Sequence, residues 1–299
     1  MEHTIHADIV FKQVKGVDIA LDVHAWPGPE LHPALLYFHG GALISGAKPA
    51  PGVLLERCRE WGYALVSANY RLAPEARWPA FRDDVVDAWR WVREQGARYG
   101  IDPERVGVCG GSAGGYLALL VGAVAEPRPR AVISFWGYGD LAAPWANEPD
   151  AFYLGQPLEE EARVREAVRG EVLTEGTDPL RGAFYRFCRQ NGLWPREVVG
   201  CDPRECPEVF DAACPERQVT PEYPPTFLMH GTADTDVPVT CADTMHAALR
   251  AAGVSTHYAR MEGGPHGLWG VTPDWAGTDE RQVRAAFEDL RAFLAEHLG

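Results

Sequence analysis

The stretch VGVCGGSAGGYLALL, residues 106–120, decides the fold. An apolar run ends in glycines around Ser112, and an apolar helical pattern follows. A strand that turns this sharply into a helix strains its apical residue, and side chains at the flanking positions would collide with neighbouring elements. We therefore expect Gly110, Gly114 and Gly115 to be needed for space. The Ser112 hydroxyl would then project into a cleft, with the free N–H groups of the helix behind it.

Strand and helix patterns alternate on both sides of this turn. Five apolar runs predict buried parallel strands: ALLYFHGG (34–41), YALVSANY (63–70), RVGVCGGS (105–112), RAVISFWGY (130–138) and PPTFLMHG (224–231). Amphipathic helix patterns lie between them. This alternation predicts a mostly parallel α/β sheet covered by helices on both faces, with ligands bound outside the carboxyl ends of the strands.

The two ends of the sheet are less regular. Residues 8–25 alternate as an antiparallel hairpin at a sheet edge does, and residues 255–261 predict a further, shorter strand. Both segments would extend the central parallel strands sideways.

One interval, residues 141–223, contains no strand pattern. It has amphipathic helix patterns at 159–172 and 181–192 and many prolines and aromatic residues. A structureless loop of this length is improbable, so we interpret the interval as a helical cap insertion over the carboxyl edge of the sheet. The core would then consist of residues 1–140 and 224–299.

The composition excludes several classes of function. The 299 residues carry a formal net charge of −14, which repels nucleic acid and anionic membranes. No run reaches the roughly 18 apolar residues that a membrane span needs, and the N-terminus MEHTIHADIVF lacks the apolar segment of a signal peptide. We expect a cytoplasmic protein. The sequence leaves its oligomeric state open, and a homodimer is one of the alternatives.

The seven cysteines are expected to be free thiols in a reducing compartment, because their number is odd and Cys58 and Cys109 fall inside apolar patterns. Four others lie close together in or near the cap, but without a C-x-x-C pair: Cys188, Cys201, Cys206 and Cys214. A zinc site there is the alternative, and unpaired thiols are the expectation.

The loop His39-Gly40-Gly41-Ala42 follows a predicted strand. Loops of this kind supply backbone N–H groups to the oxyanion that forms in acyl transfer. The candidates are the N–H groups of Gly41 and Ala113, with Gly40 as a further one. The alternative is an ordinary turn from strand to loop.

A serine hydroxyl needs a base beside it to act as a nucleophile. His266, in a glycine-rich loop after the last strand pattern, could reach the carboxyl edge of the sheet. Asp234, just beyond the strand at 224–231, is the candidate to orient it, with Asp236 as runner-up. His230 ends that strand and is expected to be a structural hydrogen-bonding residue. The order Ser112, Asp234, His266 is nucleophile, acid, base.

Two further segments are expected to have supporting roles. In YRLAPEARWPAF (70–81), we expect a turn in which Arg71 and Glu75 pair, without a catalytic function. Aromatic residues gather around the start of the cap, and at least half of them should be core. Trp136, Tyr138 and Trp145 are the candidates for the wall of an apolar acyl or alcohol pocket.

Together the motifs HGGALISG, SANYRLAPEARWPA, GGSAGG, HGTADTDVP and GGPHG, spread over residues 39–267, resemble the α/β-hydrolase superfamily and, within it, the hormone-sensitive-lipase-like esterases. The resemblance implies an α/β-hydrolase fold with the triad and oxyanion hole at the positions named above. The sequence departs from the family's pattern in two places. Ala42 stands where many relatives have a third glycine, and the cap insertion follows the sixth core strand, whereas many relatives build much of the cap from the N-terminus.

The resemblance implies a serine carboxylic-ester hydrolase that forms an acyl-enzyme and needs no metal or organic cofactor. Its partner would be a small-molecule ester, with short-chain or aromatic esters favoured because no exposed apolar lid helix stands out. The same triad also serves lactonases, thioesterases, formamidases and carbohydrate or feruloyl-type esterases. A non-catalytic ligand receptor is the alternative of another class, and such a receptor should lack a triad member.

Overall fold

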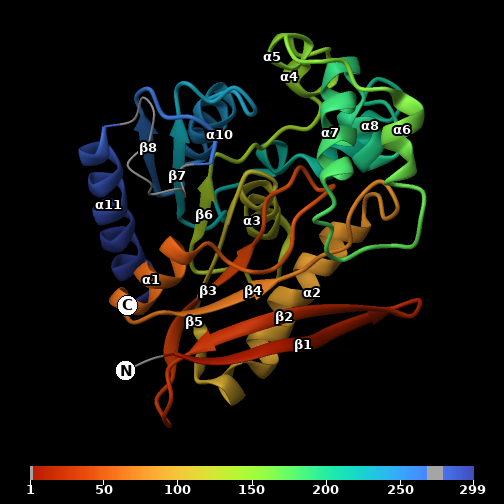
Figure 1. The fold of residues 1–299 in the computed structure, drawn as a ribbon. Coiled ribbons are helices and arrows are strands. Elements are labelled where there is room, and N and C mark those ends of the chain that lie inside the picture. The colour runs from red at the N-terminus through yellow and green to blue at the C-terminus, as the bar shows by residue number, and fades with distance from the viewer. Residues whose placement is uncertain (1–2, 268–278) are drawn as a thin grey trace.

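A computed structural model describes residues 3–267 and 279–299, which form an eight-stranded sheet with helices on both faces (Figure 1). The sheet order is β1-β2-β4-β3-β5-β6-β7-β8. The strands are β1 (Thr4–Val14), β2 (Val17–Ala25), β3 (His32–Phe38), β4 (Ala64–Ala68), β5 (Ile101–Gly111), β6 (Val132–Phe135), β7 (Thr226–Gly231) and β8 (Thr256–Met261).

The sheet is parallel from β4 to β8 and antiparallel only at the β1–β2 hairpin edge. This confirms the predicted mostly parallel sheet with a hairpin beside it. The central strands β4, β6 and β7 are buried along their whole length. Helices on both faces exclude water from them, so their sequences are continuous apolar runs.

Helices on the two faces enclose two separate hydrophobic cores. Along β3, Leu35 and Tyr37 face a core with α1 and α11, while Leu36 and Phe38 face a core with α2, α3 and α10. Successive side chains of a strand point to opposite faces, so one strand serves both cores. The elements are α1 (Gly52–Trp61), α2 (Ala80–Gln95), the short η1 (Gly96–Tyr99), α3 (Ala113–Val124), α10 (Thr240–Ala251) and α11 (Glu280–Leu298).

The segment between β6 and β7 is helical, as predicted for an insertion after the sixth strand, and its helices gather above the sheet in Figure 1. The predicted pattern at 181–192 belongs to α7, but the one at 159–172 forms only the short α6. That the cap insertion begins at residue 141 and ends at residue 223 stays a prediction. The elements are α4 (Pro144–Asn147), α5 (Ala151–Leu154), α6 (Glu161–Glu166), α7 (Pro179–Asn191), α8 (Trp194–Val199), α9 (Pro207–Ala213) and η2 (Pro215–Gln218).

Arg181 of α7 joins the cap to the core. Its side chain is 1% exposed and forms an ion pair with Glu75 at 2.8 Å. The guanidinium also donates hydrogen bonds to the carbonyl oxygens of Ile44 at 2.6 Å and Ala73 at 2.8 Å. The cap therefore holds the loop after β3 and the turn before α2 through one buried cation.

The expected pairing of Arg71 with Glu75 is wrong. Arg71 pairs with the fully buried carboxylate of Asp84 on α2 at 2.8 Å, and Glu75 pairs with Arg181. The residues are close in sequence, but the turn directs Glu75 to the cap and Arg71 to α2. Only the folded chain decides which cation each carboxylate meets.

Arg181→Met is expected to lower the free energy of unfolding by about 3–5 kcal/mol, because it leaves the Glu75 carboxylate buried without its cation. Urea unfolding measures the change. Arg284→Met in α11 is the matched control, since Arg284 forms an exposed pair with Glu280 and should cost about 0–1 kcal/mol. Equal losses in the two variants would contradict a buried anchor.

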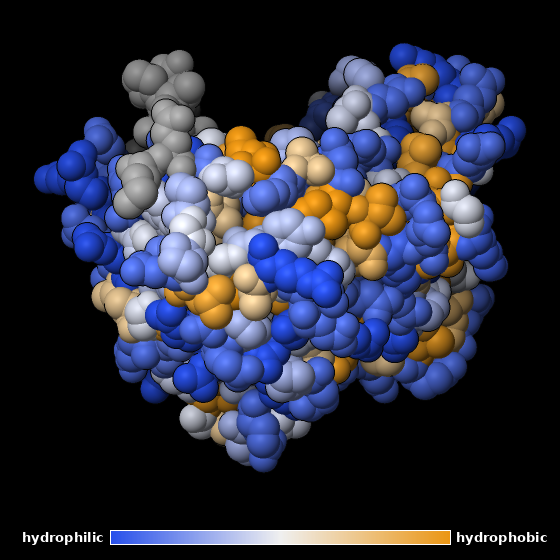
Figure 2. All heavy atoms as spheres, turned by 90° about the horizontal axis from the view of Figure 1, so that it is seen from below, coloured by the Kyte–Doolittle hydropathy of each residue, from blue (hydrophilic) through white to orange (hydrophobic). Residues whose placement is uncertain are grey.

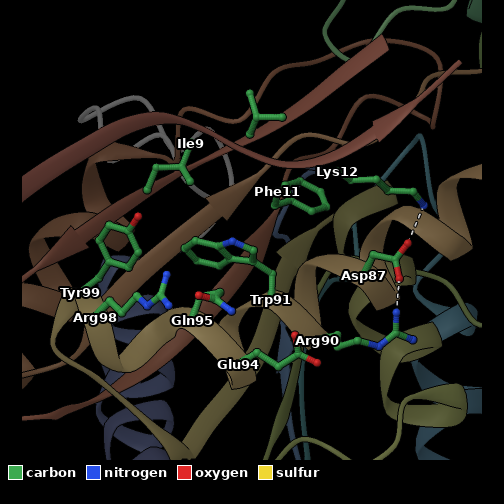
Figure 3. A pocket seen from close by; sticks show the side chains of 11 residues that line it. Ile9, Phe11, Lys12, Asp87, Arg90, Trp91, Glu94, Gln95, Arg98 and Tyr99 are labelled. Carbon is green, nitrogen blue, oxygen red and sulfur yellow. Dashed lines mark hydrogen bonds and ion pairs between the residues drawn. The ribbon is translucent and has the colours of Figure 1, made fainter. Parts of the chain in front are cut away.

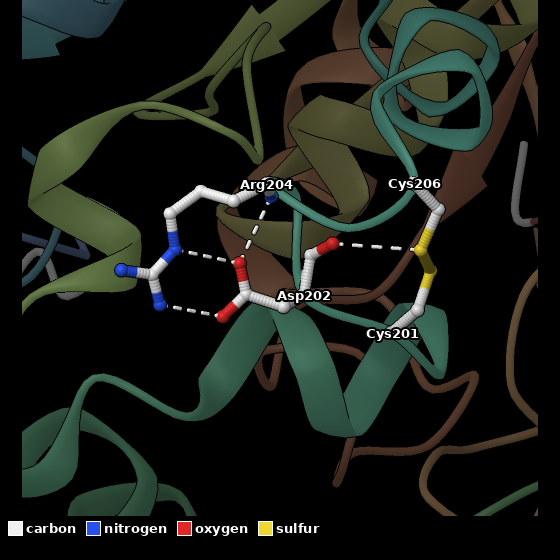
Figure 4. Close-up of a disulfide and its surroundings, with 4 residues drawn as sticks. All are labelled: Cys201, Asp202, Arg204 and Cys206. Carbon is white, nitrogen blue, oxygen red and sulfur yellow. Dashed lines mark hydrogen bonds and ion pairs between the residues drawn. A yellow bond between two sulfur atoms is a disulfide. The ribbon is translucent and has the colours of Figure 1, made fainter.

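Cys201 and Cys206 form a disulfide across the turn between α8 and α9 (Figure 4), which corrects the expectation of free thiols throughout the cap. The turn brings their Cα atoms within 6.5 Å, a spatial condition that their spacing does not reveal. Asp202 stabilises this turn by accepting hydrogen bonds from Arg204. In the described part of the chain, no group of three or more His, Cys, Asp or Glu side chains could hold a metal ion. The other cysteines are free and buried.

The face of the molecule seen from below is mainly hydrophilic (Figure 2). Figure 2 shows one face on which separate apolar patches are interrupted by hydrophilic residues. A groove between β1 and α2 is lined by apolar side chains, including Ile9, Phe11, Trp91 and Tyr99, with charged residues along its rim (Figure 3). It contains none of the candidate catalytic residues. Over residues 3–267 and 279–299, no helix has the length and apolar character required to cross a membrane.

Candidate active site

Ser112 lies at the sharp turn between β5 and α3. Its backbone has φ 57° and ψ −122°, a strained conformation for a residue with a side chain. Its N–H donates to the carbonyl oxygen of Phe135 at 2.9 Å, and its own carbonyl accepts the N–H of Tyr116 at 3.0 Å. The surrounding structure thus fixes the serine in the strained position expected at the apex.

The glycines beside Ser112 are required for space. A Cβ on Gly114 would lie 1.9 Å from the carbonyl oxygen of Phe38, at the end of β3. A Cβ on Gly110 would lie 2.3 Å from the carbonyl carbon of Gly114. Backbone meets backbone where α3 starts against β3, so no larger residue fits. This agrees with the expectation from the sequence.

The loop after β3 brings Gly40 against Ser112. A Cβ on Gly40 would lie 2.9 Å from the carbonyl oxygen of Gly111 and 3.3 Å from Ser112 Cβ. Within the described residues, no acceptor is found for the N–H of Gly40 or Gly41. Ala113 is the first residue of α3, so its N–H has no partner inside the helix. These donors are free to bind an anion beside the serine.

The loop after β3, residues 39–42, is held from both sides. Trp194 of α8 donates its indole N–H to the carbonyl oxygen of Ala42 at 2.9 Å. His39 is buried, stacks on Tyr70 with ring centroids 4.3 Å apart, and contacts the Gly40 carbonyl through Nδ1 at 2.7 Å. Burial lowers the pKa of His39 to about 4. It is therefore neutral at pH 7 and supports the loop.

Asp234 and His266 meet after the last two strands. Asp234 follows β7 and His266 follows β8, and His266 Nδ1 lies 2.7 Å from Asp234 Oδ2. Asp234 Oδ1 accepts the backbone N–H groups of Asp236 and Val237, both at 2.9 Å. His230 Nε2 lies 3.1 Å from Asp234 Oδ2 and contacts the Val237 carbonyl at 2.9 Å. These contacts hold the Asp234 carboxylate in place, and the carboxylate in turn orients the imidazole of His266.

The contact between Asp234 and His266 changes the protonation of both. Burial raises the pKa of Asp234, but hydrogen bonds from His230 and His266 outweigh it, so that pKa is lowered overall. Burial lowers the pKa of His266, but the hydrogen bond with Asp234 and the charges of Asp236 and Asp234 raise it overall. An ionised Asp234 can therefore stabilise an imidazolium at His266.

Ser112 and His266 both lie at the carboxyl edge of the sheet, after β5 and β8, and are connected through Phe135 and Trp136. The carbonyl of Phe135 accepts the Ser112 N–H, and the ring of the next residue, Trp136, lies 6.3 Å from the His266 ring. Among the described residues, no hydrogen bond joins the Ser112 hydroxyl to His266. Catalytic hydrogen bonds often form fully only when the substrate binds.

The sequence did not reveal the surroundings of Asp236. Its carboxylate accepts the hydroxyls of Tyr153 and Tyr185 and contacts Arg189, all from the cap. The one signal in the sequence that points to Arg189 is a cation within the apolar pattern of α7, which is unusual. Its fully buried side chain shows that the position belongs to the interior.

The three candidate pocket residues lie at the junction of sheet and cap. Trp136 is 3% exposed and Tyr138 is 1% exposed, while Trp145 is half-buried. Tyr138 stacks on Tyr116 at 5.1 Å and meets Trp145 edge-on at 5.6 Å. They are packed aromatic residues, and only Trp136 has its ring beside His266. Their contact with a substrate stays a prediction.

Comparison with known proteins gives consistent matches. Residues 35–270 match the family described as alpha/beta hydrolase fold. The chain is 33% identical over 283 residues to Esterase LipQ of Mycobacterium tuberculosis, covering 92% of this chain and 59% of LipQ. It is 31% identical over 242 residues to Esterase LipC of the same organism, covering 79% of this chain and 53% of LipC. The chain thus spans somewhat over half the length of these curated relatives.

Solved structures share the fold. Carboxyl esterase 2 from the fungus Tuber melanosporum superposes with a TM-score of 0.69 at 22% identity, covering 100% of this chain and 88% of that one. Identity at this level supports a common architecture.

Proposed function

The chain belongs to the α/β-hydrolase family, and we propose that it is a serine carboxylesterase with Ser112, Asp234 and His266 as its catalytic triad. One observation carries the proposal. His266 is held by a buried Asp234 at 2.7 Å, at the same edge of the sheet as a serine on a strained turn. Esterases among the relatives, LipQ and LipC, support the same reaction class.

In the first half-reaction, Ser112 Oγ attacks the ester carbonyl carbon while His266 Nε2 accepts the hydroxyl proton. Asp234 accepts the Nδ1–H and stabilises the resulting imidazolium. His266 then gives its proton to the departing alkoxide, and the acyl group stays on Ser112. Proton transfer of this kind contributes about 10²–10⁴ in rate.

The oxyanion of each tetrahedral intermediate would bind the N–H groups of Gly40, Gly41 and Ala113. Each such donor is worth about 10²–10³ in rate, because the negative charge appears only as the transition state forms. In the second half-reaction, water gives a proton to His266 and attacks the acyl carbon. The acid leaves, and Ser112 regains its proton.

An aromatic cluster at the junction of sheet and cap supports the proposed substrate class. Tyr138, Trp145 and Trp194 fill the junction of sheet and cap with ring centroids 5.2–5.6 Å apart. We infer that a short acyl chain or an aromatic ring binds beside Trp136, where these aromatic side chains would contact it. Phe152 and Leu154 of α5 are exposed apolar residues of the cap, and a long chain would have to use them.

Hydrolysis of p-nitrophenyl esters of increasing acyl length tests this function. We expect turnover of the acetate and butyrate, with kcat/KM falling as the chain lengthens, because long chains lack a site in the aromatic cluster. Rates that rise steadily into the long-chain range would contradict the proposed specificity. Absence of hydrolysis for every ester would contradict the function itself.

A further inference from the structure

A second carboxylate contacts the candidate catalytic histidine on the side opposite Asp234. Asp236 Oδ2 lies 3.4 Å from His266 Nε2, while Asp234 Oδ2 lies 2.7 Å from Nδ1. Nε2 is the nitrogen that must accept the Ser112 proton. Both ring nitrogens therefore have a carboxylate beside them, and a doubly protonated ring satisfies both contacts.

The cap holds Asp236 in this position. Asp236 Oδ1 accepts the hydroxyl of Tyr153 at 2.7 Å and that of Tyr185 at 2.6 Å. Arg189 Nη1 donates to the Asp236 carbonyl at 2.9 Å and lies 3.2 Å from Oδ1. These hydrogen bonds turn Oδ2 toward the histidine, so the orientation of Asp236 depends on α5 and α7.

Arg189 is itself rigidly placed. Its fully buried side chain pairs with Asp150 at 2.8 Å on the side away from Asp236, and its guanidinium lies over the ring of Trp145 at 5.1 Å and that of Tyr153 at 5.0 Å. A buried guanidinium with carboxylates on two sides cannot move without leaving a charge unpaired. Arg189, with Asp150 and Asp236 on either side, thus connects the cap to the candidate triad.

We propose that Asp236 is a positioning residue: held by Tyr153, Tyr185 and Arg189 of the cap, it binds the Nε2–H of His266 in the resting enzyme and sets the pH at which the base becomes available. The proposal rests on the proposed function, in which His266 is the general base. The charged groups that act on His266 are Asp234 and Asp236 from the loop after β7 and Arg189 from α7.

The sign of the effect follows from the charges. The negative charge of Asp236 favours the protonated imidazolium and contributes to the raised pKa of His266. The histidine must lose its Nε2 proton to water before it can accept one from Ser112. Asp236 therefore makes His266 a stronger base but moves its availability to higher pH.

Asp236→Asn tests this role through the pH profile of kcat/KM for p-nitrophenyl acetate. Asparagine keeps the size and an oxygen for the tyrosine hydroxyls but removes the charge. The acid limb of the profile is expected to move to lower pH. At pH 5.5, kcat/KM as a fraction of its plateau value should therefore be about two- to tenfold higher in the variant than in the parent. Loss by one constant factor at every pH would mark a merely structural residue and overturn the proposal.

Asp150→Asn is the matched control. It alters the other carboxylate partner of Arg189 without removing the charge beside His266, so its acid limb should coincide with that of the parent. If the acid limb moved equally in both variants, a general disturbance of the cap would explain the change, and the proposal would be overturned.

An NMR titration of His266 needs no turnover. Ser112→Ala and the double variant Ser112→Ala/Asp236→Asn are compared, with the His266 resonance identified by its loss in His266→Gln. A lower midpoint in the double variant supports the role of Asp236 even if the parent protein hydrolyses no ester. An unchanged midpoint in an active esterase would overturn the role of Asp236 and leave the function standing.

Discussion

Ser112→Ala is expected to reduce kcat/KM for p-nitrophenyl acetate by about 10⁴-fold or more, the scale observed when a triad nucleophile is removed. Alanine lacks the Oγ that forms the acyl-enzyme, and neither His266 nor the oxyanion donors can replace it. The fold should persist, because alanine keeps the same Cβ and the Ser112 N–H bond to Phe135. Rate assays with a circular dichroism check measure both.

Covalent labelling by a fluorophosphonate gives the control for this variant. The parent should be labelled at Ser112, Ser112→Ala should not be labelled, and Ser255→Ala, at an exposed serine before β8, should react as the parent does. Full activity in Ser112→Ala would refute the nucleophile. An unlabelled and inactive parent would favour a ligand receptor over an enzyme.

Asp234→Asn is expected to lower kcat by about 10⁴, the scale known for this change in a catalytic triad. Two backbone N–H groups bind Asp234 Oδ1 at 2.9 Å, which places the new NH₂ group where Oδ2 stands, facing His266 Nδ1. Two donors cannot share a hydrogen bond, so the imidazole must carry its proton on Nε2 instead. In that tautomer it cannot accept the proton of Ser112.

Asp236→Asn is the matched comparison for this prediction, because it is the same substitution two residues away. It removes a contact to Nε2 but leaves the Nδ1–H partner in place, so we expect a far smaller loss at the pH plateau. Steady-state kinetics of the two variants at one pH above the acid limb decide between them. A larger loss in Asp236→Asn would make Asp236 the triad acid.

Much of the architecture could be predicted from local pattern. The buried strands appear as continuous apolar runs because both faces of the sheet are covered. The turn at Ser112 is marked by glycines because the start of α3 touches the end of β3, with only 1.9 Å for a Cβ at Gly114. These are short-range constraints on side-chain size, and residue identity expresses them directly.

The partners of charged side chains could not be predicted in this way. Glu75 was expected to pair with Arg71, four residues away, yet it pairs with Arg181 of the cap at 2.8 Å. Cys201 and Cys206 were expected to be free and are joined. Long flexible side chains and cysteine pairs depend on distances across the folded chain, on which sequence spacing has little influence.

By itself the sequence determined the mostly parallel sheet and the helical insertion after its sixth strand, and it supplied candidate residues for a nucleophile, an acid and a base, because each depends on pattern or motif within a short segment. Only the tertiary structure decided that Asp234 stands behind His266 Nδ1 and that the cap directs Asp236 to Nε2. The two aspartates are two residues apart and chemically identical. Which nitrogen each one faces is set by hydrogen bonds from groups distant in the chain, such as Tyr153 and Arg189.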